Sequence, residues 1–481
     1  MTDTITGNPT IAAYTGPIDL SRPHFVGIGG CAMSGLARLL VELGHEVSGS
    51  DLRDSAALAA LRAAGVRTQV GHDPAYTEGA SCVVYTTVAQ NAPEVRAARV
   101  AGVPVVHRAQ VLDVLAAARR LVAVSGSHGK STTAGMLAHI LRTLGQDPSY
   151  LIGADVAEVG SGTHLGASRL LVAEADESDR SFHFLTPSIA VITNVTDDHP
   201  ENFVSHAEVL RAYVGFGGRV APDGFLIVNA DCVGATVAAN VIADERPDLT
   251  VLRYGRDRTA DVRLLDVHAE GWSASATVRM PNGTEVRLTL PTPAAHHLDN
   301  AAAAIACAVA LGLDPVDVAG AVCSFAGVRR RFEHIDTRAG VTVIDSYADH
   351  PHEIAADLDA ARTLARGRVF VVFQPSGHAR VLAFGERIGG VLADKADHVL
   401  LLDVHGTVPT GRPVADTSAI VARLREGDYC LPLGPDQAAR LIGRMAGRGD
   451  VVLTMGTGDV TGYGAAILDA LSSRSEVALS A

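Results

Sequence analysis

Short apolar runs alternate with longer stretches rich in alanine and leucine from His24 onward. Apolar runs of this length are typical of parallel strands buried on both faces, and the longer stretches are typical of the helices that connect such strands. The pattern therefore predicts an α/β protein with mostly parallel sheets. The predicted strands are Phe25–Ile28, Glu46–Gly49, Val83–Thr86, Val103–Val106, Leu121–Val124, Leu170–Ala173, Ile189–Thr193, Phe225–Val228, Val341–Ile344, Val369–Phe373, His398–Leu402 and Val451–Met455.

The alternation restarts twice, which predicts three α/β domains and agrees with a length of 481 residues. Between Asp261 and Leu290 the pattern changes to a two-residue period around Pro281-Asn-Gly283, which is typical of a β-hairpin. We expect this segment to add antiparallel strands to the edge of the central domain. The predicted divisions are a flexible leader (1–20) and domains at 21–118, 119–327 and 328–481.

The composition narrows the classes of function. A net charge of −13 disfavours a nucleic-acid partner, because duplex binding requires a basic face. The first 20 residues have neither the basic start nor the apolar core of a signal peptide, and no apolar run reaches the roughly 18 residues of a membrane helix. The six cysteines are scattered without a Cys-x-x-Cys pair, which favours reduced thiols over disulfides or a zinc site. We therefore expect a soluble cytoplasmic enzyme.

The strongest chemical signal is the segment Gly126-Ser127-His128-Gly129-Lys130-Ser131-Thr132, which follows a predicted strand and precedes a predicted helix. The chain has only two lysines among its 40 basic residues, and Lys130 is one of them. A compact ammonium fits among phosphate oxygens, and the two glycines let backbone N–H groups turn toward a polyphosphate. A hydroxyl from Ser131 or Thr132 can bind the accompanying Mg²⁺. The order of strand, glycine-rich loop and helix predicts binding of ATP or GTP.

A second glycine pattern lies in the first domain. Gly27, Gly29 and Ala32 satisfy the G-x-G-x-x-G/A spacing between a strand and a helix, and Asp51 follows about 20 residues later. This arrangement holds a pyrophosphate at a helix N-terminus, with a carboxylate near a ribose. Taken alone it favours an NAD-dependent oxidoreductase. Because a separate phosphate loop follows, a second diphosphate ligand such as a nucleotide sugar is the more economical interpretation.

Carboxylates follow two predicted strands of the central domain. Glu174, Asp176, Glu177 and Asp179 come directly after one strand, and Asp198-His199 comes after the next. The carboxyl ends of parallel strands share one edge of the sheet, which is where ligands bind in open α/β folds. Oxygen ligands with one imidazole beside a phosphate loop suit Mg²⁺. A solvated acidic turn is the alternative interpretation of such a run.

The ordered set of motifs resembles the muramyl (Mur) ligases of peptidoglycan synthesis, most closely their alanine-adding branch. The resemblance spans residues 24 to about 465, which makes it more specific than any single motif. Its remaining blocks are Met33-Ser-Gly35, Gly327-Val-Arg-Arg-Arg-Phe332, Asp345-Ser-Tyr347, His350-Pro351 with Glu353, Gln374-Pro375 and Gly456-Thr-Gly-Asp-Val460.

The resemblance implies a Rossmann-like N-terminal domain that binds UDP-N-acetylmuramate, a central P-loop ATPase-type domain that binds ATP and Mg²⁺, and a Rossmann-like C-terminal domain that binds the amino acid, expected to be L-alanine. It implies that Lys130 contacts the β- and γ-phosphates. By the same resemblance the site residues are Gly29, Gly30 and Asp51 for the UDP-sugar; Ser131 and Glu174 for one metal ion and Glu174 with His199 for a second; His296 and Asn300 on the adenine side; Arg331 for the phosphates; and Tyr347, Asp349 and Arg380 for the amino acid.

The implied reaction is amide formation through an acyl phosphate, which turns a poor acceptor, the carboxylate, into an activated one. Positive charge at the phosphate site would stabilise phosphoryl transfer, and domain closure would exclude water from the acyl phosphate. His199 or Asp198 is a candidate base for the amine if it is not committed to metal. Related ligases carry a carbamoylated lysine near the metal, but no lysine lies between Lys130 and Lys395.

The acceptor region departs from the family pattern. Asp349-His350-Pro351 stands where the family commonly has His-His-Pro, and Ser376–Arg380 replaces a run that is richer in histidine. His297 is also unusual beside His296. An acid at position 349 would repel an incoming carboxylate and attract a cation. The departures therefore leave two interpretations. The chain is either a specialised paralogue with a different amine acceptor or an ordinary alanine ligase in which these positions have drifted neutrally.

Other classes remain as alternatives at this stage. An NAD-dependent oxidoreductase would leave Lys130 and Glu174 without a role. A P-loop switch or motor would leave the blocks at 345–353 and 456–460 unexplained. A sibling ligase that adds a peptide to recycled muramate, or glutamate to folate, is closer in chemistry. The folate case is disfavoured, because folate has no diphosphate to bind in the first domain.

Overall fold

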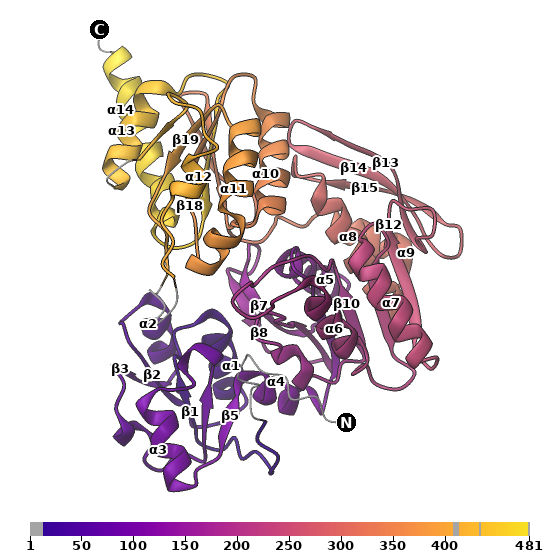
Figure 1. Ribbon diagram of the computed structural model, residues 1–481. Coiled ribbons are helices and arrows are strands. Elements are labelled where there is room, and N and C mark those ends of the chain that lie inside the picture. Colours follow the sequence, from indigo (N-terminus) through magenta and orange to yellow (C-terminus); the bar gives the residue numbers. More distant parts are fainter. Residues whose placement is uncertain (1–12, 407–412, 432–433, 480–481) are drawn as a thin grey trace. The chain divides into compact units, whose positions relative to one another are not determined.

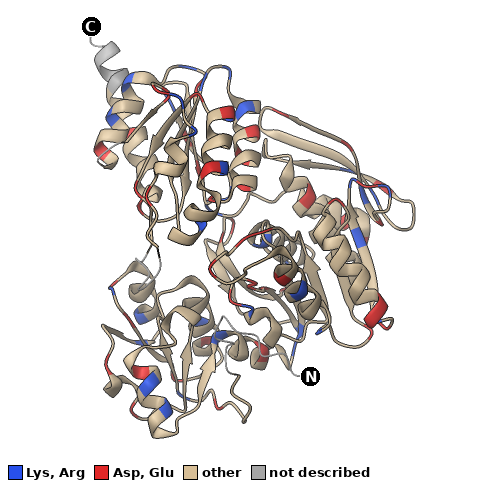
Figure 2. Ribbon diagram, viewed as in Figure 1, with Lys and Arg blue, Asp and Glu red and all other residues tan. Residues whose placement is uncertain are grey.

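The computed structural model describes residues 13–406, 413–431 and 434–479 (Figure 1). The chain forms two compact units. The first unit comprises residues 1–196, 207–262 and 303–321, and the second comprises 197–206, 263–302 and 322–481. Lys and Arg are interspersed with Asp and Glu in both units (Figure 2).

The first unit opens with a five-stranded parallel sheet in the order β3-β2-β1-β4-β5. Its central strands β1 and β4 are buried throughout, as expected for strands covered on both faces. The chain order reverses at β1, and the carboxyl ends of β1 and β4 are therefore where open α/β folds are expected to bind ligands. The elements are β1 (Pro23–Val26), α1 (Cys31–Glu42), β2 (Ser48–Asp51), α2 (Ala56–Ala63), β3 (Arg67–Val70), η1 (Pro74–Thr77), β4 (Cys82–Tyr85), η2 (Thr87–Ala89), α3 (Pro93–Ala101), β5 (Val105–His107) and α4 (Arg108–Ala116).

A second sheet in the first unit runs in the order β12-β11-β10-β6-β9-β7-β8. All of its pairs are parallel except β7 with β8. Its elements are β6 (Arg120–Ser125), α5 (Lys130–Thr143), β7 (Ser149–Val156), β8 (Ser161–His164), β9 (Leu170–Glu174), η3 (Ser181–Phe184), β10 (Ile189–Ile192), α6 (His206–Gly217), β11 (Phe225–Asn229), α7 (Val233–Glu245), β12 (Thr250–Gly255) and α9 (Pro315–Val322).

The second unit contains the predicted antiparallel addition. Strand β14 (Ser273–Arg279) pairs with β13 (Val262–Glu270) on one side and β15 (Glu285–Leu290) on the other. The turn between β14 and β15 is closed by a hydrogen bond from the Met280 amide to the Thr284 carbonyl, 2.8 Å long. Gly283 adopts φ +83°, a conformation that glycine reaches without strain. Helix α8 (His296–Ala310) follows β15, beyond the break at 291–293.

The C-terminal sheet has the order β16-β17-β21-β18-β19-β20, in which only β16 is antiparallel. Helices α10 and α11 pack on one face, and α13 and α14 pack on the other, so that two apolar cores enclose the sheet. The elements are β16 (Glu333–Arg338), β17 (Val341–Ser346), α10 (Pro351–Leu364), β18 (Val369–Gln374), α11 (His378–Lys395), β19 (His398–Leu401), α12 (Ser418–Val421), β20 (Tyr429–Cys430), α13 (Pro435–Met445), β21 (Val451–Gly456), η4 (Asp459–Gly462) and α14 (Tyr463–Leu479).

The predicted parallel strands are all present, with small corrections at their ends. The strand predicted at Phe25–Ile28 ends at Val26, because Gly27 turns the backbone at φ +79°. The strand predicted at Glu46–Gly49 is shifted to Ser48–Asp51. Residues 1–12 of the predicted leader lie outside the described residues. None of the helices in the described ranges combines the length and apolar content needed to cross a bilayer.

Candidate functional site

The glycine-rich loop between β6 and α5 is shaped by its glycines. Gly126 has φ +140° and Gly129 has φ +81°. A Cβ atom at Gly126 would lie 1.8 Å from the Thr193 hydroxyl, so a side chain cannot be accommodated without rearrangement. The loop is also tied to the end of β10, since the His128 amide donates to Asn194 Oδ1 at 2.8 Å. The loop therefore delivers the chain to the N-terminus of α5, where backbone N–H groups favour an anion.

The Lys130 ammonium is held in place by this loop. It donates to the Gly126 carbonyl at 2.7 Å and to Glu177 Oε1 at 2.7 Å. Burial alone would lower the pKa of Lys130, but the Glu177 carboxylate outweighs burial and raises the pKa above its ordinary value. The side chain thus places a cation at the helix N-terminus, where contact with a polyphosphate is expected.

The acidic run after β9 serves two structural purposes. Glu174 is in register with Val124 of β6, and its Oε1 atom accepts a hydrogen bond from the Gly153 amide at 2.7 Å. Glu174 therefore ends its strand beside the strand that leads into the phosphate loop, while Ser131 is buried in the first turn of α5. Carboxylate and hydroxyl oxygens are suitable ligands for Mg²⁺. By contrast, Asp176 is paired with Arg108 of α4 at 2.7 Å and Asp179 with Thr87 of η2 at 2.5 Å.

The remaining phosphate-loop residues are positioned by the same contacts. The Ser127 hydroxyl donates to the Thr196 carbonyl at 3.2 Å, and His128 Nε2 lies 3.3 Å from the Thr196 hydroxyl. Thr132 is buried in α5. Both hydrogen bonds are to Thr196 in the segment after β10, and they hold the loop against the end of that strand.

The segment with Asp198 and His199 belongs to the second unit. His199 has a left-handed backbone at φ +53°, and its Nδ1 atom lies 3.2 Å from Glu201 Oε1. Asp198 accepts hydrogen bonds from both the His199 amide at 2.8 Å and the Arg380 guanidinium at 2.8 Å. The structure therefore joins Asp198 to the acceptor-side arginine. The predicted pairing of His199 with Glu174 stays a prediction, because the two residues lie in different units.

The glycine turn of the first sheet is linked to the predicted ribose residue. Asp51 Oδ2 accepts a hydrogen bond from the Gly29 amide at 2.9 Å. A Cβ atom at Gly29 would come within 2.9 Å of both Asp51 and Leu58, so glycine is required for this close approach. Gly30 precedes the first residue of α1 in an extended conformation. The turn thus presents a helix N-terminus at the crevice of the sheet.

The acceptor-side residues converge in the C-terminal sheet. Arg380 Nη1 donates to Asp349 Oδ2 at 2.5 Å, and the Ser376 hydroxyl also donates to Asp349. Burial alone would lower the pKa of Arg380, but Asp349 and Asp198 reverse this and raise it above its ordinary value. The predicted attraction of Asp349 for a cation is therefore already satisfied by an arginine of the chain.

Tyr347 is exposed, and its ring lies near two arginines. The guanidinium carbons of Arg330 and Arg331 lie 5.1 Å and 4.8 Å from its ring centroid. Arg331 Nη1 also lies 3.9 Å from Glu353, whereas Arg330 pairs with Asp345 at 3.0 Å. Arg331 is thus the arginine of this pair that extends toward the start of α10.

The residues predicted for the adenine side lie in the first two turns of α8. His296 Nε2 is 3.6 Å from Asp357 Oδ1, and the other oxygen of Asp357 accepts a hydrogen bond from Ser346. Burial raises the pKa of Asp357 to about 7. Asn300 lies one turn after His296 on the same helix. His297, the unusual residue beside His296, is buried.

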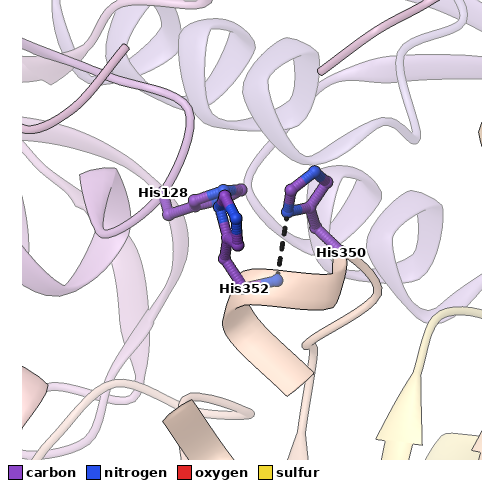
Figure 3. A group of neighbouring side chains, drawn as sticks. All are labelled: His128, His350 and His352. Carbon is purple, nitrogen blue, oxygen red and sulfur yellow. Dashed lines mark hydrogen bonds between the residues drawn. The ribbon is translucent and has the colours of Figure 1, made fainter. Parts of the chain in front are cut away.

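His350 begins α10 by capping it. Its Nδ1 atom accepts a hydrogen bond from the His352 amide at 3.3 Å, drawn as the dashed line in Figure 3. Its Nε2 atom lies 3.1 Å from the Asp197 carbonyl. His128, also drawn, belongs to the first unit and is not assigned to a site with these two histidines.

Sequence reasoning missed three residues that organise the site: Glu177, Asp357 and Arg330. Glu177 was visible only as one member of an acidic run, and its pairing with Lys130 distinguishes it from Asp176 and Asp179. Asp357 gave no signal, because a single acid within a predicted helix usually faces solvent. Arg330 was one of three consecutive arginines, and nothing local separates it from its neighbours.

Comparisons with known proteins identify the relatives of this chain. Three family models match in order: the catalytic domain of the Mur ligase family over residues 22–120, the Mur ligase middle domain over 124–308 and the Mur ligase glutamate ligase domain over 330–458. The UDP-N-acetylmuramate–L-alanine ligase of Streptomyces coelicolor is 40% identical over 461 residues, covering 95% of this chain and 99% of the relative. The corresponding ligase of Kineococcus radiotolerans is 42% identical and covers 97% and 99%.

A solved structure agrees with these matches. The UDP-N-acetylmuramate–alanine ligase of Thermotoga maritima superposes with a TM-score of 0.78 at 25% identity, covering 94% of this chain and 99% of that protein. A murein peptide ligase from Psychrobacter arcticus superposes with a TM-score of 0.70 at 24% identity, with the same coverage, and supports the fold alone.

Proposed function

This chain belongs to the Mur ligase family, and we propose that it is an ATP-dependent amide ligase that joins L-alanine to UDP-N-acetylmuramate. The observation that carries the proposal is the near-complete coverage of ligases with this activity at about 40% identity. The three-domain α/β fold and the phosphate loop around Lys130 support it. The alternative of an NAD-dependent oxidoreductase has no comparable support, because the glycine turn of the first sheet is a shared feature of nucleotide-binding folds.

The proposed division of labour follows the order of the domains. Residues 21–118 would bind the UDP-sugar through Gly29, Gly30 and the Asp51 region. Residues 119–327 would bind ATP, and residues 328–481 would bind the amino acid. All six cysteines lie in the described ranges and carry thiols rather than disulfides, which supports a proposed location in the cytoplasm.

We propose that Lys130 and the N-terminus of α5 hold the phosphates of ATP. The Lys130 ammonium would exchange its contact with Glu177 for phosphate oxygens, because both partners are anionic and lie within reach of a flexible side chain. Arg331 is the proposed cation from the C-terminal domain, and His296 and Asn300 are the proposed contacts of the adenine. These groups orient the phosphoryl donor toward the muramyl carboxylate and stabilise its charge.

The proposed metal ligands are Ser131 and Glu174 for one Mg²⁺ and Glu174 with His199 for a second. The donor set fits a hard cation, since Ser131 and Glu174 follow adjacent strands and supply oxygen atoms. Bound Mg²⁺ neutralises phosphate charge during phosphoryl transfer. His199 or Asp198 is the proposed acceptor of the amine proton. Asp198 is hydrogen-bonded to Arg380, and His199 can take this role only if it is not committed to the metal ion.

One observation favours a second candidate function, a paralogue of this ligase with a different amine acceptor. The guanidinium of Arg380, the proposed contact for the amino acid, is bonded to Asp349 and Asp198. An ordinary α-amino acid would need that guanidinium for its carboxylate.

The proposal is tested by orthophosphate release from the purified full-length chain with ATP, MgCl₂, UDP-N-acetylmuramate and L-alanine. We expect release that requires all four components and a product whose mass equals that of the nucleotide sugar joined to alanine with loss of water. Release that does not depend on the muramyl substrate would contradict the proposal. A panel of amines in place of L-alanine separates the two candidate functions.

A further inference from the structure

Asp349, Ser376 and Arg380 lie at the position in the C-terminal sheet where open α/β folds bind ligands. Asp349 follows β17, whereas Ser376 and Arg380 follow β18. Strand β21 pairs with both and lies between them, although it comes last in the chain. The strand order therefore reverses here, and a crevice at the carboxyl ends of these strands is the expected ligand site.

The Arg380 guanidinium at this position is hydrogen-bonded to two carboxylates. Nη1 of Arg380 donates to Asp349 at 2.5 Å, and Nη2 donates to Asp198 at 2.8 Å, with Nε 3.2 Å from the same Asp198 oxygen. The side chains of Asp349 and Asp198 are each 7% exposed, and that of Arg380 is 16% exposed. Both ion pairs are thus largely removed from water, where charge-assisted hydrogen bonds are strong and costly to break.

The charges around this crevice favour an amine over a carboxylate. Two carboxylates surround one guanidinium, so the group carries one net negative charge. Glu353 adds a further acid, and Arg331 lies 3.9 Å from it. A carboxylate placed beside Arg380 would be repelled by Asp349 and Asp198, whereas an ammonium would be attracted.

We propose that Asp349 is a specificity-determining residue that occupies the Arg380 guanidinium in place of the acceptor's α-carboxylate. The chain then selects its acceptor through the amine, and the α-carboxylate contributes little to binding. The acceptor class that fits is a small primary amine whether or not it carries a carboxylate. This inference rests on the proposed ligase activity and defines the acceptor specificity of the same site.

The Michaelis constants of two acceptors test whether the α-carboxylate contributes to binding. L-alanine and L-alaninamide differ in the carboxylate, and the native enzyme should use both with KM values within about threefold, because an unused carboxylate contributes little free energy. In Asp349→Asn, Arg380 keeps Asp198 and becomes available to a carboxylate. The KM for L-alanine relative to that for L-alaninamide should then fall about tenfold, the range for one hydrogen bond to a charged group.

A second variant should leave the same ratio unchanged. The Ser376 hydroxyl donates to Asp349. Ser376→Ala removes that donor but keeps the pair between Asp349 and Arg380, so the guanidinium stays occupied and the KM values for L-alanine and L-alaninamide should remain within about threefold of each other. A shift in Asp349→Asn without a shift in Ser376→Ala would not result from a general loss of structure at this position.

The matched control is Glu386→Gln. Glu386 lies on the same helix as Arg380 and pairs with Arg423 at 2.7 Å, on the exposed surface. The substitution removes the carboxylate partner of Arg423 and leaves Asp349 and Arg380 unchanged. The ratio of the KM for L-alanine to that for L-alaninamide should therefore not change. The inference is overturned if Asp349→Asn leaves the ratio unchanged or raises it while turnover persists. Absence of turnover with either amine in the native enzyme would instead refute the proposed ligase activity.

Discussion

The two cation sites of this chain use opposite designs. Lys130, at the phosphate loop, has a single carboxylate partner, Glu177, and otherwise donates to loop carbonyls. Arg380, at the proposed acceptor site, is held by two carboxylates from different segments of the chain. A flexible ammonium with one acid can be transferred to an anionic ligand at modest cost, whereas a doubly bonded guanidinium cannot. The comparison indicates that the proposed phosphate site can release its cation to a ligand and that the proposed acceptor site holds its cation more tightly.

The sharpest test of the phosphate site is Lys130→Ala. Without the ammonium, charge that develops on the phosphates is not neutralised, and orthophosphate release should fall at least about a hundredfold. The matched control is Lys395→Ala, which removes the other lysine of the chain and breaks its pair with Asp359 on the surface. Equal activity of the two variants would contradict the assignment of Lys130.

The oxygen ligands of the phosphate site are tested by Glu174→Gln. An amide is a weaker ligand than a carboxylate, so the Mg²⁺ concentration that gives half-maximal turnover should rise about tenfold or more. A titration with MgCl₂ at saturating ATP measures it. If the variant loses activity at all Mg²⁺ concentrations while its melting temperature drops, Glu174 acts through its hydrogen bond to Gly153 instead.

The shape of the loop is tested by Gly126→Ala. The backbone at φ +140° and the predicted overlap with Thr193 should cost about 2–3 kcal/mol of unfolding free energy. Gly145→Ala is the control, because Gly145 has φ +73° but no atom within 4 Å of its added Cβ, and the cost there should be about 1 kcal/mol. Chemical denaturation of both variants gives the comparison, and similar costs would mean that the overlap relaxes freely.

The smallest effect concerns pH and the acceptor half of the molecule. Burial raises the pKa of Asp357 from 3.8 to about 7, so the folded state binds more protons than the unfolded state between those values. Stability therefore falls as pH rises through that window. Asp357→Asn removes this dependence on pH. The gain in unfolding free energy of the variant over the native chain should therefore be larger at pH 8 than at pH 4, by about 1 kcal/mol or more. Thermal unfolding at both pH values measures the change, and a pH-independent difference would contradict it.

The two regions also differ in how far sequence determines them. The strand at Leu170–Glu174 and the loop at Gly126–Lys130 were predictable, because apolar runs and glycines act locally. The edge strands β3 and β16 were not predicted, because Arg67–Val70 and Glu333–Arg338 are mostly polar and lack an apolar signal. The pairing of Arg380 with Asp198 joins residues 182 positions apart and depends on tertiary packing. The candidate residues could therefore be predicted from the sequence, but the residues to which they are hydrogen-bonded could not.

The central claim is that ATP cleavage is coupled to amide formation on the muramyl carboxylate, and an isotope measurement tests it most directly. UDP-N-acetylmuramate labelled with ¹⁸O in both carboxylate oxygens is turned over with ATP, Mg²⁺ and an amine acceptor, and the orthophosphate is analysed by mass spectrometry. Passage through an acyl phosphate transfers one labelled oxygen to the orthophosphate and leaves the other in the amide. Orthophosphate free of label, released at the same rate as amide forms, would contradict the account.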